Sequence, residues 1–123
     1  MLAVACSSAI SSTQPLQVGD QAPSFELPGT DGKSHALPVP DQADAPWTVL
    51  AWFPKAYTSG CTIECRSLAK NGHLIKKFNV RYFMLSVDPI ETNTAFAADE
   101  EADFPLLSDA TTEIAEKYGV WVL

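Results

Sequence analysis

Apolar and polar positions first indicate a β-hairpin. Phe25 and Leu27 alternate with polar residues, residues 30–32 (TDG) form a turn sequence, and a second short run ends at Leu37. Residues 38–46 (PVPDQADAP) are rich in proline and polar side chains, and they predict a loop.

Later apolar runs predict further strands. Residues 47–53 (WTVLAWF) are continuously apolar and lie between prolines, which is typical of a parallel strand buried on both faces. Residues 80–87 (VRYFMLSV) have the same character, and residues 104–109 (FPLLSD) contain a third short strand and its exit. Residues 120–123 (VWVL) start another strand.

Between these runs the apolar spacing is helical. One stripe recurs at alternating steps of four and three residues: Cys61, Cys65, Leu68, Gly72 and Ile75. Both thiols therefore share the inward face of one helix.

Two further helices have start and stop signals. The pair Asp88-Pro89 is suited to an N-cap and a first-turn proline. Ser108 or Asp109 can cap the helix after the short strand, and Gly119 stands where a left-handed stop is needed.

The predicted order of elements is β-β-loop-β-α-β-α-β-α-β. It indicates an α/β sandwich in which crossover helices join parallel strands. The chain has 123 residues, of which 46% are hydrophobic, enough for one packed core. We expect one domain over residues 18–123, preceded by a tail over residues 1–17.

Charge narrows the set of partners. The 15 acidic and 8 basic residues give a formal charge of −7, which repels phosphate backbones and anionic membrane surfaces. Nucleic acid is therefore not an expected partner. No stretch reaches the roughly 20 apolar residues that a membrane helix requires.

The amino-terminal residues allow two interpretations. Ala3-Val4-Ala5 before Cys6 is similar to the small-residue box that precedes the lipidated cysteine of bacterial lipoproteins, with a polar tether after it. The alternative is a disordered polar tail, since only five residues precede Cys6. We expect a cytoplasmic protein if Met1 is the true start, and otherwise a lipid-anchored or periplasmic one.

The candidate chemistry lies where the strand over residues 47–53 meets the following helix. A cysteine in the first turn of a helix meets unsatisfied N–H groups and the positive end of the helix dipole, and both favour the thiolate. Cys61 is expected in the first turn of this helix. Thr58 is close enough in sequence to donate its hydroxyl to the sulfur, Gly60 leaves room for a close approach, and Pro54 can shield one side from water.

These residues resemble a known family. Pro54, Thr58 and Cys61 fit the P-x-x-x-T-x-x-C pattern of peroxiredoxins. The fuller stretch FPKAYTSGCTIEC, with FPLLSD and EKYGV downstream, is most similar to the Q-type group, also called bacterioferritin comigratory proteins. The resemblance covers about residues 16 to 122 and implies a thioredoxin-like fold, with a central mixed sheet flanked by helices and preceded by a hairpin.

The resemblance also implies a function. The chain would be a thiol-dependent peroxidase that reduces hydrogen peroxide and organic hydroperoxides in antioxidant defence. Cys61 would be the peroxidatic cysteine, Thr58 would align the peroxide with the sulfur, and Pro54 would shield the sulfenic acid. No metal or organic cofactor is implied, thioredoxin or a glutaredoxin-like donor would be the reductant, and a monomer or weak dimer is expected.

Cys65 has two open interpretations. The Q-type resolving cysteine often lies five residues after the nucleophile, whereas Cys65 lies four after Cys61. Helical Cβ atoms at this spacing are about 5–6 Å apart, whereas a disulfide requires roughly 3.5–4.5 Å. Cys65 therefore either resolves Cys61 after the first helical turn unwinds, or is a buried core cysteine while an external thiol resolves Cys61.

A second departure concerns the family's arginine. Family members carry it on a strand just beyond the last position of this sequence, where its guanidinium holds the thiolate and polarises the peroxide. Lys55, Arg66 and Arg81 are cations near the site in sequence, but none has the family position. We expect a carboxy-terminally incomplete domain that lacks the last strand and helix, and weak activity if the chain is complete.

Two other functions stay open. One is a disulfide reductase of thioredoxin type, although thioredoxins place two residues rather than three between their cysteines. The other is a non-catalytic redox-sensing or binding relative. His35 and His73 are expected at the surface, Cys61, Cys65 and His73 are a poor zinc set, and residues 99–103 (DEEAD) are expected to be a solvated acidic loop.

Overall fold

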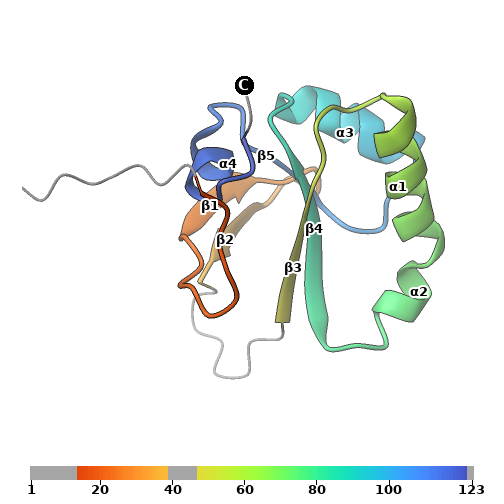
Figure 1. Ribbon diagram of the computed structural model, residues 1–123. Helices are drawn as coiled ribbons and strands as arrows, with labels where there is room; N and C mark the ends of the chain where they lie inside the picture. Colours follow the sequence, from red (N-terminus) through yellow and green to blue (C-terminus); the bar gives the residue numbers. More distant parts are fainter. Residues whose placement is uncertain (1–13, 39–46, 122–123) are drawn as a thin grey trace, which may run out of the picture.

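The computed structural model describes residues 14–38 and 47–121, and up to residue 117 its strands and helices follow the predicted order, with one predicted helix divided in two. The elements are β1 Phe25–Pro28, β2 Ser34–Leu37, β3 Trp47–Trp52, α1 Ser59–Lys70, α2 Gly72–Ile75, β4 Val80–Ser86, α3 Ile90–Asp99, β5 Leu106–Ser108 and α4 Glu113–Lys117 (Figure 1). The predicted α/β architecture is confirmed.

The described strands form two sheets. β1 and β2 pair antiparallel as the predicted hairpin, with Phe25 opposite Leu37. β3, β4 and β5 form a parallel sheet in that order, joined by the crossover helices. The hairpin turn meets β5 through a bridge between Gly29 and Leu107, so the hairpin lies against the sheet.

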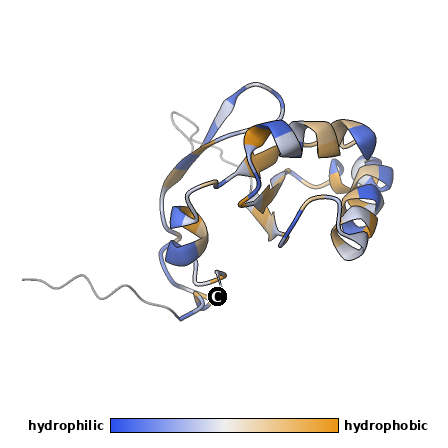
Figure 2. Ribbon diagram, turned by 90° about the horizontal axis from the view of Figure 1, so that it is seen from above, coloured by the Kyte–Doolittle hydropathy of each residue, from blue (hydrophilic) through white to orange (hydrophobic). Residues whose placement is uncertain are grey.

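Alternating side chains of β4 build two apolar cores, one on each face of the sheet. Met84 packs with both cysteines of α1 and with Phe96 of α3. Its neighbours Phe83 and Leu85 point to the other face, toward the hairpin and α4. Figures 1 and 2 show the same layers, with hydrophobic strands at the centre and helices on both sides.

A buried polar network ties α3 to the sheet. The Asn93 side-chain amide Nδ2 donates to Ser86 Oγ at 3.0 Å and to Ser108 Oγ at 2.9 Å. All three side chains are buried. The network therefore joins α3 to the carboxyl ends of both β4 and β5.

The expectation that β3 is buried on both faces is wrong. Within the described residues β3 pairs with β4 alone, and Trp47 and Val49 are 83% and 47% exposed. A continuous apolar run specifies side chains that favour burial, but not how many neighbouring elements cover them.

The long helix is divided. The predicted stripe is confirmed, but α1 ends at Lys70, Asn71 adopts a non-helical φ of −102°, and α2 begins at Gly72. The Asn71 side-chain Nδ2 donates back to Ser67 O at 2.8 Å. This local bond competes with regular helix at Asn71.

The start of α3 differs from the prediction. Pro89, not Asp88, is the N-cap residue of α3. The Asp88 carboxylate instead accepts hydrogen bonds from the Ala56 N–H and from the Ser86 hydroxyl, each at 2.9 Å. Asp88 thus binds the N–H of Ala56, 32 residues earlier in the chain, instead of the first N–H groups of α3 that the capping rule assigns to it.

Asp109 acts at the start of α4 as expected. Its carboxylate accepts from the N–H groups of Ile114 and Ala115 at 3.2 and 2.8 Å, although the residue at the N-cap position is Thr112 with φ +64°. Gly119 has the predicted left-handed backbone, with φ +68°.

The strand predicted from residue 120 is wrong for residues 120 and 121. The Val120 N–H donates to Ala115 O at 3.0 Å, so the chain turns back onto α4 after Gly119. Residues 122–123, residues 1–13 with Cys6, and most of the predicted loop lie outside the described residues. None of the described helices is long and apolar enough to cross a membrane.

Candidate active site

Cys61 lies in the first turn of α1, on the face that packs against the sheet. It is 6% exposed and belongs to the core cluster that also contains Phe53, Ala56 and Met84. The first turn has no acidic residue, and no side chain caps its N–H groups. The positive end of the helix is therefore free to favour an anion at this turn.

Thr58 is the N-cap residue of α1, but its hydroxyl is not directed as predicted. The backbone is extended, with ψ 152°, and the hydroxyl donates to Lys55 O at 2.8 Å rather than to the Cys61 sulfur. With its proton used in this bond, Thr58 Oγ1 keeps lone pairs that can accept a hydrogen bond from a bound molecule.

The loop between β3 and α1 is held by backbone bonds and by one carboxylate. The Phe53 N–H donates to Leu85 O at 2.9 Å, which extends the pairing of β3 with β4. The Ala56 N–H then donates to Asp88 Oδ2 at 2.9 Å. The position of Cys61 is thus fixed from the sheet.

Tyr57 lies in this loop with a strained backbone. Its φ is +64°, a left-handed value that is uncommon for a bulky residue. Its hydroxyl donates to Asp99 Oδ2 at 2.8 Å, and its ring packs edge-on against Phe96 with centroids 5.2 Å apart. The hydrogen bond to Asp99 raises the pKa of the Tyr57 hydroxyl.

Pro54 is exposed and lines an apolar cavity of about 270 Å³ together with Phe53, Trp52 and Trp121. Neither Thr58 nor Cys61 lines this cavity. The structure therefore places Pro54, Thr58 and Cys61 on one short segment, with Pro54 facing a separate recess.

Cys65 follows one helical turn after Cys61 and is fully buried at 0% exposure. Both cysteines are free thiols. Burial, with smaller contributions from the charges of Glu100 and Glu64, raises the pKa of the Cys65 thiol from 9.0 to about 11. Cys65 therefore stays protonated at neutral pH.

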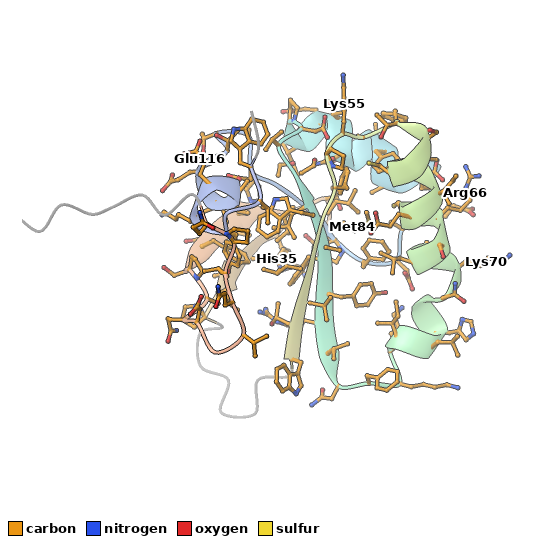
Figure 3. All side chains as sticks on the ribbon, viewed as in Figure 1. His35, Lys55, Arg66, Lys70, Met84 and Glu116 are labelled. Atoms are coloured by element: carbon orange, nitrogen blue, oxygen red, sulfur yellow. The ribbon has the colours of Figure 1, made fainter. Side chains whose placement is uncertain are left out.

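The three cations considered from the sequence have different surroundings. Figure 3 shows Lys55 pointing away from the molecule and Arg66 on the outer side of α1. Arg81 lies at the opposite end of the sheet from Cys61, where its Nη2 donates to Thr48 Oγ1 at 3.2 Å.

Asp99, Glu101 and Asp103 are exposed as expected, but three of the acidic residues at the end of α3 and after it also bind other elements. Asp99 binds Tyr57, Glu100 binds Arg66 Nε at 2.9 Å, and Asp103 binds Lys76 Nζ at 2.9 Å. These contacts join the end of α3 to α1, α2 and the loop before Cys61. The sequence showed only the charge run, because the partners are 27 to 42 residues earlier.

The two histidines differ. His73 is exposed as predicted. His35 is half-buried, its Nε2 lies 2.9 Å from Asp31 Oδ2, and its ring packs against Phe83 with centroids 4.9 Å apart. Across the described ranges no three His, Cys, Asp or Glu side chains gather as metal ligands.

Sequence reasoning missed four residues whose side chains contact α3, α1 or the loop before Cys61: Tyr57, Asp88, Asp99 and Glu100. Tyr57 stands within the site motif, but nothing in the motif indicates its left-handed backbone. The carboxylates lie beyond the next strand, and the βαβ order could have placed only Asp88 at the same sheet edge as Cys61.

Comparison with known proteins supplies the family. The sequence matches the AhpC/TSA family over residues 18–123. The chain belongs to this family. It is 36% identical over 107 residues to the peroxiredoxin Bcp of Escherichia coli K12, which covers 87% of the chain and 67% of that protein.

A second relative from this family is similar to the chain to the same extent. A putative peroxiredoxin of Mycobacterium tuberculosis is 37% identical over 108 residues, covering 85% of the chain and 67% of the relative. The chain thus spans about two thirds of the length of these curated relatives. The similarity to Q-type peroxiredoxins is confirmed.

Solved structures of the family confirm the thioredoxin-like fold. The peroxidoxin BcpB of M. tuberculosis superposes with a TM-score of 0.74 at 31% identity, covering 82% of this chain and 64% of that one. The bacterioferritin comigratory protein of Xanthomonas campestris has a TM-score of 0.69 at 22% identity, covering 76% and 58%, and supports the fold alone.

Proposed function

We propose that this chain is a thiol-dependent peroxidase that acts in antioxidant defence, with Cys61 as the peroxidatic cysteine. Hydrogen peroxide and organic hydroperoxides are the substrates, and a thioredoxin-type or glutaredoxin-like thiol is the reductant. Its relatives from E. coli and M. tuberculosis are a peroxiredoxin and a putative peroxiredoxin, which supports this proposal.

The first step is a displacement at the peroxide oxygen. The Cys61 thiolate supplies an electron pair, a sulfur–oxygen bond forms, and the oxygen–oxygen bond breaks. The leaving oxygen takes up a proton and departs as water or an alcohol. The Cys61 sulfur is oxidised to sulfenic acid and the peroxide is reduced.

One observation carries this proposal: Cys61 lies in the uncapped first turn of α1, just after the carboxyl end of strand β3. Open N–H groups at such a turn stabilise the thiolate and the developing negative oxygen. Gly60 leaves open space beside Cys61, since a Cβ at this position would have no atom within 4 Å apart from its chain neighbours and its own helix backbone.

Thr58 and Pro54 support the reaction in this proposal. The Thr58 hydroxyl, fixed by its bond to Lys55 O, accepts a hydrogen bond from the peroxide and directs it toward the sulfur. Pro54 is exposed just after β3, and its ring is proposed to shield the sulfenic acid from water. Cys65 is proposed to resolve the sulfenic acid after α1 opens, because a buried, protonated thiol cannot attack from within the closed helix.

The test is peroxide consumption with dithiothreitol as reductant, using hydrogen peroxide and an organic hydroperoxide in parallel. We expect Cys61→Ser to reduce the rate to that of buffer. Without dithiothreitol, which would itself reduce a sulfenic acid, Cys65→Ser is expected to retain one turnover of sulfenic acid formation. Ser67→Ala, on the exposed side of the same helix, serves as the control and keeps the wild-type rate.

Full activity of Cys61→Ser would overturn the assignment. Reduction of a protein disulfide without peroxide consumption would support a thioredoxin-type reductase instead. Sulfenic acid on Cys61 without turnover would support the redox-sensing alternative.

A further inference from the structure

The segment that carries both thiols is tied to α3 at each of its ends. We call residues 57–66 the redox segment. At its start the Tyr57 hydroxyl donates to Asp99 Oδ2 at 2.8 Å, and at its end Arg66 Nε donates to Glu100 Oε2 at 2.9 Å. The two acceptors are adjacent residues at the carboxyl end of α3.

The two contacts have features that favour a closed segment. The Glu100 side chain is 8% exposed although it carries a charge, so Arg66 is its compensating partner. The Tyr57 ring adds an edge-on contact with Phe96, the residue one turn before Glu100. Tyr57 keeps a left-handed backbone, with φ +64°, which such contacts must hold in place.

Disulfide formation requires this closed segment to open. Cβ atoms four residues apart on a helix are about 5–6 Å apart, and a disulfide needs roughly 3.5–4.5 Å. Cys65 is also fully buried, on the side where Glu100 disfavours its thiolate. Attack by Cys65 on an oxidised Cys61 thus needs the helix between them to unwind and Cys65 to leave the core.

We propose that Asp99 and Glu100 are positioning residues that hold the redox segment closed and thereby set the rate at which a Cys61–Cys65 disulfide forms. This inference rests on the proposed peroxidase function. The closed form presents Cys61 to peroxide, and release of the two contacts lets Cys65 reach it.

Disulfide formation needs no reactant other than Cys65 and the oxidised Cys61. The Cys65 sulfur attacks the sulfenic sulfur of Cys61, a sulfur–sulfur bond forms, and the sulfur–oxygen bond breaks. The hydroxyl group leaves as water with the proton that Cys65 loses. Cys65 is oxidised, Cys61 is reduced from the sulfenic level, and peroxide is the only oxidant.

The experiment uses Tyr57→Phe and Arg66→Met, which remove one contact each and keep most of each side chain's apolar part. After mixing with one equivalent of hydrogen peroxide, acid-quenched samples are resolved by mass into sulfenic acid and disulfide. Each substitution is expected to accelerate disulfide formation by about two- to five-fold, as for partly exposed pairs. The double variant should multiply the two effects.

Three controls separate positioning from general loosening. Asp99→Asn keeps an oxygen acceptor for Tyr57 and should stay near the wild-type rate, whereas Asp99→Ala should match Tyr57→Phe. Lys76→Met removes the Lys76–Asp103 pair, which links α2 to the same region outside the redox segment, and should leave the rate unchanged. Sulfenic acid formation, followed in a Cys65→Ser background, should have the same rate with and without Tyr57→Phe.

The outcomes are distinguishable. Unchanged disulfide rates in both single variants, or equal acceleration by Lys76→Met, would overturn the inference while leaving the peroxidase intact. Persistent sulfenic acid without disulfide in the wild type would also overturn it. A wild type that forms no sulfenic acid contradicts the proposed function itself.

Discussion

Cys61 and Cys65 lie one helical turn apart but have different surroundings. The sequence predicted their shared inward face from spacing alone, and the structure confirms it. The sequence could not predict that Glu100, 35 residues after Cys65, comes close enough to disfavour the Cys65 thiolate. The direction of the Thr58 hydroxyl was missed for a related reason: a rotamer is chosen by nearby acceptors such as Lys55 O.

The pH dependence of Cys65 alkylation follows from its surroundings. Alkylation requires the thiolate, and a raised pKa keeps Cys65 in the thiol form until higher pH. In a Cys61→Ser background, alkylation by iodoacetamide should be slow at neutral pH and rise toward a midpoint of about 11.

The same variant in urea provides the reference for this prediction, with a midpoint near the ordinary value of 9.0. A folded protein whose Cys65 titrates at or below that value would contradict the burial described here.

At the scale of elements, apolar periodicity and turn chemistry located the hairpin, α1, β4 and β5. Helix ends were less predictable. Asp109 holds the first N–H groups of α4 as expected, but Asp88 binds Ala56 instead of capping α3. Cap rules are local, and a carboxylate at a sheet edge has long-range donors that these rules do not consider.

The Asn93 network predicts a measurable loss of stability. Asn93→Ala leaves the hydroxyls of Ser86 and Ser108 without their buried partner and opens a cavity. We expect the free energy of unfolding to fall by about 2–3 kcal/mol in urea denaturation.

Thr94→Ala is the matched control, because Thr94 is the next residue of α3 and is exposed. Its effect should stay within about 0.5 kcal/mol. Equal effects at the two positions would show that the network does not fix α3 to the sheet.

For the molecule as a whole, strand and helix order alone predicted the α/β architecture. The sequence did not predict which apolar surfaces other elements would cover. The apolar side chains Val49 and Phe78 are 47% and 69% exposed, and with Ile75 they line an apolar cavity of about 310 Å³ beside β3. A sequence records that such residues are hydrophobic, but not whether another part of the fold reaches them.

This apolar surface should bind a hydrophobic dye. We expect enhanced fluorescence of an anilinonaphthalene sulfonate in the native protein, and a decrease of about two-fold or more in Val49→Lys. Ile63→Lys places the same charge at a residue 66% exposed on α1, away from this cavity, and should leave the signal unchanged. Equal signals in the two variants would contradict dye binding beside β3.

The proposed function depends above all on the oxidation of Cys61 by peroxide. The most direct measurement exposes the native protein to one equivalent of hydrogen peroxide in the presence of dimedone, and locates the sulfenic adduct by peptide mass spectrometry. We expect an adduct on Cys61 and none on Cys65 while α1 is closed. An adduct confined to Cys65, or none on either cysteine, would contradict it.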